Sequence, residues 1–223
     1  MGFEFKWEVM WQSVPLLLTG VKWTIVITVI GLIFGFILGA VFGLLKLSRN
    51  KYLKKLASIY IESVRGTPLM VQVMFLYFGL PLALGMRIPP LTAGITAIAV
   101  NSGAYIAEIV RGAVQSIDKG QIEAGRSIGL NRYQTMRYVT WPQAFKRMIP
   151  PLGNQFIISL KDTSLLVVIG VAELTRQGQE IVADTFRAFE VWLTVAILYL
   201  IMTMTLSKLL GIVEKRLHVR GGA

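Results

Sequence analysis

The sequence predicts an all-α integral membrane protein with about five transmembrane helices. Hydrophobic residues make up 54% of the 223 positions, which is too high for an ordinary soluble domain. Several apolar runs reach the length of about 20 residues that a helix needs to cross the hydrocarbon core of a bilayer. The segments between these runs alternate between strongly basic and weakly acidic, as loops do on the two sides of a membrane.

The apolar runs predict five spans, and their bounds are 16–45, 58–86, 91–110, 148–170 and 189–211. The first run is too long for the apolar region of a cleavable signal peptide, and the basic stretch that such a peptide needs is missing. Before this run, residues 1–14 place five apolar residues at helical spacing: Phe3, Trp7, Met10, Trp11 and Val14. This pattern predicts an interfacial N-terminal helix with aromatic anchors, and a disordered tail is the alternative.

Basic residues indicate which ends of the spans face the cytoplasm. The segment 46–55, KLSRNKYLKK, contains five positive charges, whereas GMRIPP between the second and third spans contains one. The segment 171–190 has two positive and four negative charges, while 111–147 is basic. Positive charge marks the cytoplasmic side, so we expect the N-terminus outside and the C-terminus in the cytoplasm. A basic membrane surface also accounts for the net charge of +11, and nucleic acid is not an expected partner.

The longest cytoplasmic connection, within 115–142, predicts two short helices that meet at a glycine. Asp118 can cap the first helix, and Gly129 can adopt the left-handed conformation that ends it. Asn131, with a glutamine three residues later, matches a capping box for the second helix, and Pro142 is expected to restart the chain toward the fourth span. Apolar residues on such a projection favour a protein partner, but packing against the protein's own span ends is an equal alternative.

This connection resembles the EAA loop of bacterial ATP-binding-cassette importer permeases. The family pattern is E-A-A, three residues, G, nine residues, I-x-L-P, and this chain matches its spacing with Glu123, Ala124, Gly125, Gly129, Val139, Trp141 and Pro142. Gly125, Val139 and Trp141 depart from the pattern but remain small or apolar. The segments ESVRGTPLMVQ (62–72), NSGAYIAEIVRGA (101–113) and SLKDTSL (159–165) are similar to the polar amino-acid uptake branch of the family.

The resemblance implies a multi-pass permease of the bacterial inner membrane, with one transmembrane domain over residues 1–223, that moves a polar amino acid. In this family the loop contains a coupling helix that docks on an ATPase subunit. Glu123 would then be the charged anchor of the docked face, Ala124 and Gly125 would keep that face small, and Gly129 would fix the turn.

The resemblance also implies partners. The chain has no G-x-x-x-x-G-K-[ST] sequence, so ATP and magnesium are expected on separate ATPase subunits, and no cofactor or enzymatic activity is expected on this chain. The other implied partners are a second copy or a paralogous permease and an extracytoplasmic amino-acid-binding protein. The predicted seat of that binding protein is 171–190, on a helix face with Ile181, Val182, Phe186 and Phe189.

Polar residues near the middle of two spans predict the substrate pathway. Lys161 lies about 20 Å along the fourth span and Asn101 about 15 Å along the third, so Asn101, Lys161 and Asp162 share a depth. Transport sites lie near the midplane, and an ionisable residue there indicates function. Asp162 would accept the ammonium group of an amino acid, and hydrogen bonds would come from Asn101, Ser102, Thr163 and Ser164. Helix–helix packing is the alternative role for the three hydroxyl residues.

Two further features concern the inner ends of the spans. Glu62 with Arg65, and Glu108 with Arg111, lie three residues apart and predict local ion pairs, for which a gating role is the alternative. Thr67 followed by Pro68 predicts an interruption of the second span at which a half-helix begins.

Two other classes of function explain less of the sequence. A stand-alone ion-coupled carrier would explain the buried charges, but it leaves the cytoplasmic loop without a purpose. An intramembrane enzyme would need a nucleophile with its base or a metal cluster, and the spans contain neither cysteine nor histidine.

Overall fold

The computed structural model describes residues 4–217, and every regular element in that range is helical. In chain order the helices are α1 (Trp7–Lys46), α2 (Lys51–Arg65), α3 (Leu69–Met74), η1 (Phe75–Gly79), α4 (Leu80–Leu84), α5 (Pro90–Gln115), α6 (Lys119–Ser127), α7 (Arg132–Thr135), η2 (Met136–Thr140), α8 (Trp141–Asp162), η3 (Thr163–Ile169), α9 (Leu174–Thr185) and α10 (Ala188–Arg216). The π-helical turns η1 and η2 join the helices on both sides without a break, and the 3-10 segment η3 continues α8 and ends before Gly170. The all-α fold class is confirmed.

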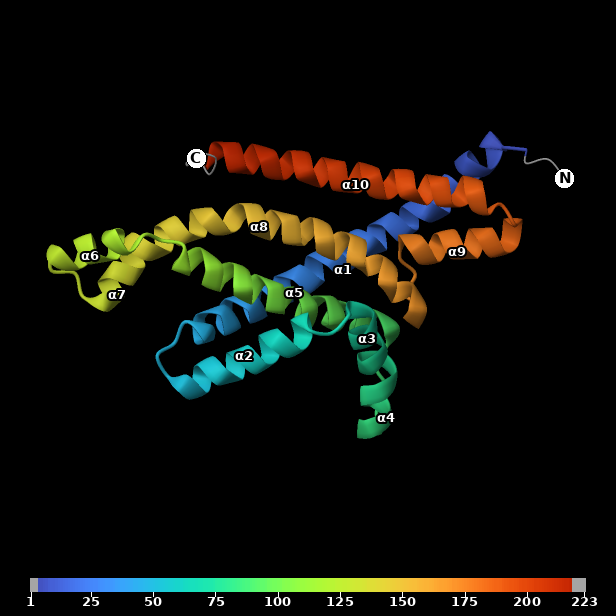
Figure 1. The fold of residues 1–223 in the computed structure, drawn as a ribbon. Coiled ribbons are helices and arrows are strands. Elements are labelled where there is room, and N and C mark those ends of the chain that lie inside the picture. The colour runs from blue at the N-terminus through green and yellow to red at the C-terminus, as the bar shows by residue number, and fades with distance from the viewer. Residues whose placement is uncertain (1–3, 218–223) are drawn as a thin grey trace.

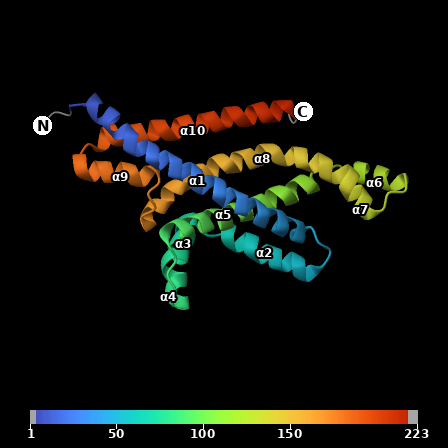
Figure 2. The ribbon, with the colours of Figure 1, turned by 180° about the vertical axis from the view of Figure 1, so that it is seen from behind.

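The long helices run side by side, and their connections gather at two opposite ends (Figure 1). One end holds the α1–α2 turn, the α6–α7 hairpin and the end of α10. The other holds the start of α1 and helix α9, as the reverse view also shows (Figure 2). These two ends contain the basic and the acidic segments of the sequence, respectively, so the arrangement agrees with the predicted orientation.

Four helical rods are long and apolar enough to cross a membrane: α1, α5, the rod from Arg132 to Ile169, and α10. The second predicted span, 58–86, differs from the structure. It is a broken pair, α2 and the α3–α4 rod, bent by 103°. The break falls at Gly66, Thr67 and Pro68, because proline lacks a backbone N–H and disfavours the helical conformation of the residue before it.

Helices α1 and α5 approach closely along a stripe of buried glycines on α1: Gly31, Gly35, Gly39 and Gly43. A Cβ atom added at Gly39 would lie 2.5 Å from the Cβ of Ile106 on α5. Because lipid is as apolar as a leucine side chain, helices in a membrane associate by such close packing rather than by the hydrophobic effect. The α1–α5 pair is therefore the frame on which the other helices are placed.

The N-terminal segment differs from the prediction of a separate helix within 1–14. Helix α1 begins at Trp7 and continues through Pro15 without a break. Pro15 fits because the carbonyl that it leaves without a helical partner belongs to Trp11, an exposed residue near the end of the helix. Trp7 and Trp11 are exposed, as interfacial anchors would be. Their position at the membrane interface stays a prediction. Phe3, part of the same pattern, lies outside the described residues.

The connection between η3 and α9 is organised around Glu173, whose side chain is fully buried. Its carboxylate caps α9 by accepting hydrogen bonds from the backbone N–H groups of Thr175 and Arg176, at 2.9 and 2.8 Å. The Tyr199 hydroxyl of α10 donates a third bond at 2.9 Å. Burial raises the pKa of the Glu173 carboxyl above its ordinary value, and these donors oppose the shift. Glu173 thus fixes α9 against α10.

Candidate functional site

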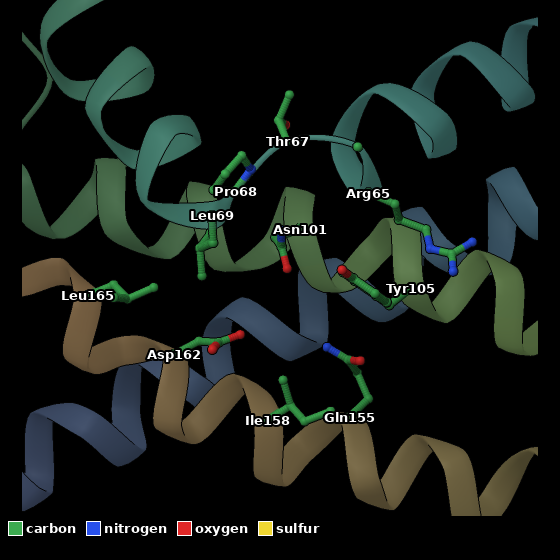
Figure 3. Close-up of a pocket in the computed structure, with 11 residues that line it drawn as sticks. Arg65, Thr67, Pro68, Leu69, Asn101, Tyr105, Gln155, Ile158, Asp162 and Leu165 are labelled. Carbon is green, nitrogen blue, oxygen red and sulfur yellow. The ribbon is translucent and has the colours of Figure 1, made fainter.

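A cavity of about 590 Å³ opens where the α2–α3 break faces α5 and α8 (Figure 3). The break contributes residues 65–69, α5 contributes Asn101 and Tyr105, and the α8–η3 rod contributes Gln155, Ile158, Asp162 and Leu165. Figure 3 shows the Asn101 and Asp162 side chains facing the same space from two helices. These two residues, which were predicted to share a depth, line one cavity.

The neighbouring residue Lys161 lies outside this cavity. The α-helical part of the rod ends at Asp162, where the 3-10 segment begins. Lys161 is exposed and Asp162 is half-buried. Neither forms a salt bridge within 4.0 Å with any residue between 4 and 217. Within residues 4–217, Asp162 is therefore a carboxylate that faces the cavity without a salt-bridge partner.

The three predicted hydroxyl residues do not line the cavity. The Ser102 hydroxyl lies against Gly35 of α1 and donates to the Ala99 carbonyl at 3.4 Å. The Thr163 hydroxyl is fully buried and donates to the Leu160 carbonyl at 2.8 Å. Ser164 is half-buried on η3. The contacts of Ser102 and Thr163 are those of the packing role that the sequence also allowed.

The α2–α3 break is bridged by Gln72 of α3, a residue that the sequence interpretation did not select. Its amide Nε2 donates to the Thr67 carbonyl and hydroxyl, both at 3.0 Å, and its Oε1 accepts from Asn101 Nδ2 at 3.1 Å. The Thr67 hydroxyl donates to the Ser63 carbonyl at 3.0 Å. Thr67 therefore closes α2 rather than capping the next half-helix, whose first flanking residue is Pro68.

A charged cluster at the inner end of the cavity is centred on Glu108. Arg111 contacts its carboxylate at 2.6 Å, Lys46 of α1 at 3.5 Å and Arg65 of α2 at 3.6 Å. The predicted Glu108–Arg111 pair is present. The predicted Glu62–Arg65 pair is wrong, because Arg65 turns to Glu108 and Glu62 pairs with Lys46 at 3.4 Å. The cluster therefore joins three helices instead of bracing one.

Arg65 connects this cluster to the cavity. Its guanidinium lies 5.3 Å from the centre of the Tyr105 ring, and both side chains line the cavity. A movement of α2 relative to α5 would separate Arg65 from Glu108 and Tyr105 together. The geometry thus couples the inner boundary of the cavity to the positions of two spans.

The predicted cytoplasmic hairpin is present. Asp118 caps α6 by accepting from the Gly120 N–H at 2.6 Å, and Gly129 has a φ of 87°. Asn131 and Gln134 form the capping box of α7, with both bonds at 2.9 Å. The chain does not restart at Pro142, however. The helix continues through Pro142, because the π-helical turn η2 lies just before it. The shifted hydrogen-bond pattern of this turn accommodates the backbone N–H that Pro142 lacks.

The hairpin residues divide between an inner and an outer face. Glu123 and Ala124 are exposed, whereas Gly125 is buried, and a Cβ there would lie 3.3 Å from Thr135. Gly125 therefore serves the packing of the hairpin itself. Ile128 and Tyr133 are 78% and 70% exposed, which leaves an apolar surface outside the helical bundle.

The predicted seat of the amino-acid-binding protein, at the opposite end of the molecule, also divides into inward-facing and outward-facing residues. Ile181 is buried and Val182 is half-buried, so both pack inward. Phe186 is 88% exposed with a φ of 55°, and Phe189 is 56% exposed. Of the four predicted apolar residues, only the two phenylalanines thus contribute to the outward surface of this segment.

Sequence interpretation missed Tyr105, Gln155 and Gln72. A signal existed for Gln155, because it precedes Asp162 by seven residues and therefore shares its helix face after two turns. Tyr105 likewise follows Asn101 by four residues. Gln72 had no such signal, since its role depends on a bend of 103° that periodicity does not reveal.

Comparisons with known proteins agree with this geometry. Residues 31–219 match the family described as "Binding-protein-dependent transport system inner membrane component". The glutamine transport system permease protein of Escherichia coli (strain K12) is 53% identical over 97% of this chain and 99% of its own length. The L-cystine transport system permease protein of Bacillus subtilis (strain 168) is 38% identical over 97% and 93%.

A solved structure, described as the crystal structure of an amino acid ABC transporter with histidines, has the same fold. It superposes with a TM-score of 0.92 at 43% identity and covers 96% of this chain and 100% of its own. The MetNI methionine ABC transporter, at 24% identity and a TM-score of 0.78, supports the fold alone. The chain therefore belongs to the family of binding-protein-dependent transport system inner membrane components, the permease subunits of ABC importers.

Proposed function

We propose that the substrate of this permease is a polar amino acid of the glutamine type and that it crosses the membrane through the cavity lined by Asn101 and Asp162. The observation that carries the proposal is the Asp162 carboxylate, which faces this cavity without forming a salt bridge within residues 4–217. A charged group inside a membrane needs a partner, and the ammonium group of an amino acid supplies one.

The substrates named for the relatives support an amino acid as the substrate of this permease and indicate its chemical type. The relative at 53% identity is named for glutamine and the relative at 38% for L-cystine. These two substrates share the α-ammonium and α-carboxylate groups. Asp162 would bind the ammonium group, while Arg65 is the cation within the cavity that suits the carboxylate. Ser102, Thr163 and Ser164 would support the helices and not contact the substrate.

The cluster around Glu108 is the proposed inner gate. Arg65, paired with Glu108 beside Arg111, would hold α2 against α5, and Glu62, paired with Lys46, would hold α2 against α1 while the cavity is closed to the cytoplasm. The bonds are partly exposed, so each contributes little energy and can be exchanged during a transport cycle.

Energy would come from separate ATPase subunits, which bind ATP and magnesium. Glu123 and Ala124 on the exposed face of the hairpin, together with Ile128 and Tyr133, would contact the ATPase. Gly125 and Gly129 would shape the hairpin from within. Closure of the ATPase subunits would then move α6 and α7 and, through the continuous α7–η3 rod, the cavity.

A second permease subunit, either another copy or a paralogue, would complete the membrane domain. Lys161 supports this proposal, because an exposed lysine in the middle of a span is costly against lipid. A second subunit or the water-filled pathway between two subunits would cover it. An amino-acid-binding protein would dock outside on Phe186 and Phe189.

Reconstitution tests this function. The tagged permease should copurify an ATPase subunit from the native membrane. In liposomes, the complex with its binding protein should take up labelled glutamine only when ATP is hydrolysed. Uptake by the permease alone, driven by an ion gradient, would contradict the proposal and favour a stand-alone carrier.

A further inference from the structure

The amide of Gln72 is held in one orientation by groups that cannot change their role. Its Nε2 lies 2.7 Å from the Val64 carbonyl and 3.0 Å from the Thr67 carbonyl. A backbone carbonyl can only accept a hydrogen bond, so only the NH₂ side of the Gln72 amide can face these atoms. Its Oε1 must then point the other way, toward α5.

This orientation passes on to Asn101. The Gln72 Oε1 can only accept, and it lies 3.1 Å from the Asn101 amide. Asn101 therefore presents its NH₂ group to Gln72 and its Oδ1 to the cavity. Figure 3 shows the oxygen of Asn101 pointing into the space that Asp162 also faces. Asn101 is 7% exposed, so a reversed Asn101 amide would place its Oδ1 against Gln72 Oε1, two acceptors together, where little water could separate them.

We propose that Gln72 is a positioning residue that makes this part of the cavity an acceptor-only subsite, formed by Asn101 Oδ1 and the Asp162 carboxylate, for a protonated amine. The inference rests on the proposed function, and it adds the polarity of the subsite and the residue that sets it. An ammonium group has three N–H donors and no acceptor, so it satisfies both oxygens. A hydroxyl in the same place has a single donor and would leave one oxygen unpaired.

The same contacts link the subsite to the shape of the α2–α3 break. Gln72 lies on α3, its bonds reach back to the end of α2, and its partner Asn101 lies on α5. When α2 moves, the bonds to Val64 and Thr67 change and the orientation of Asn101 is no longer imposed. Loss of the substrate amine from the subsite would accompany opening of the break.

Direct binding of labelled ligands to the purified permease–ATPase complex tests the proposal. Binding is measured without the binding protein, whose own affinity would otherwise set the apparent constant. The ligands are L-glutamine and its 2-hydroxy analogue, in which a hydroxyl replaces the α-ammonium group. The readout is the ratio of the two affinities, which a general loss of folded protein does not change.

Gln72→Met keeps the length of the side chain and removes the amide. We expect the preference for the amine over the hydroxyl to fall about tenfold, because Asn101 is then free to turn its NH₂ group into the cavity. Gln177→Leu is the matched control, because Gln177 is a buried glutamine on α9 outside the cavity. This variant should leave the ratio unchanged.

Asn101→Asp keeps the proposal testable if the Gln72 variants do not assemble. Aspartate has only acceptor oxygens, so this variant should retain the preference for the amine. In the Asn101→Asp background, Gln72→Met should no longer alter the ratio. An equal fall of the ratio in both backgrounds, or loss of amine preference in Asn101→Asp, would overturn the role of Gln72.

Failure of the proposed function has a different signature. In that case the wild-type complex would not bind glutamine at this cavity, and Asp162→Asn would leave binding unchanged. A wild-type complex that prefers the amine, together with a Gln72→Met variant of unchanged ratio, would instead refute only the inference about Gln72.

Discussion

Replacement of Gly129 should uncouple the hairpin from its ATPase through the backbone alone. Its φ of 87° is one that side chains rarely adopt, and a Cβ built there meets nothing within 4 Å. Space is therefore not limiting, and the whole effect of a substitution comes from conformation. The left-handed region costs an ordinary residue about 1–2 kcal/mol, which is a factor of about 5–30 in population, and a β-branched residue more.

Gly129→Val should therefore weaken docking of the purified ATPase by at least about that factor, since affinity falls with the fraction of hairpin in the competent conformation. Titration of the ATPase into permease held in lipid nanodiscs measures the change. Gly129→Asn should bind nearly as wild type, because asparagine tolerates the left-handed region. Gly112→Val is the control, since Gly112 also has open space but an ordinary φ. Wild-type affinity in Gly129→Val, or equal losses in Val and Asn variants, would refute the reasoning.

Three further predictions concern topology, packing and pH. Single cysteines at Ser48 and Ser127 in this cysteine-free chain should react only with membrane-permeant reagents, and one at Gln179 with impermeant reagents as well; labelling of Ser48 from outside would reverse the orientation. Gly39→Ala should lower the free energy of unfolding by about 1–3 kcal/mol, because a Cβ at position 39 lies 2.5 Å from Ile106. Gly211→Ala is the control, since a Cβ at position 211 meets nothing within 4 Å. Equal stabilities of the two variants would refute the close α1–α5 contact. Because burial raises the pKa of Glu173 above its unfolded value, the native state keeps this proton longer. Stability should fall as pH rises through that window, and Glu173→Gln should flatten the profile in thermal melts; an unchanged profile would exclude Glu173 as its source.

Local chemistry made the cytoplasmic hairpin predictable from the sequence. Asp118, Gly129 and Asn131 each act within a few residues of themselves, through caps and a left-handed turn. The shared depth of Asn101 and Asp162 was predictable for a related reason, since the rise of a helix converts residue number into distance. Features that depend on one helix at a time were therefore accessible.

Features that depend on how helices cross were not accessible in the same way. Glu62 and Arg65 are correctly spaced for a pair, but each finds a partner on another helix. Ser102 is one residue from Asn101 and faces α1 instead of the cavity, because neighbouring positions on a helix point about 100° apart. The direction of the α3–α4 rod after Pro68 follows from tertiary packing, so neither the bend nor the bridge made by Gln72 appeared in the sequence pattern.

The most direct test of the proposed pathway is substrate-dependent transport by Asp162→Asn. Asparagine keeps the volume and some hydrogen bonding but removes the charge, and Asp162 has no salt bridge to lose within the described part of the chain. We therefore expect the complex to assemble with wild-type yield and thermal stability while ATP-driven uptake of glutamine falls at least about tenfold, because a charge-assisted hydrogen bond is lost. A stable Asp162→Asn complex that transports at the wild-type rate would contradict the proposed pathway.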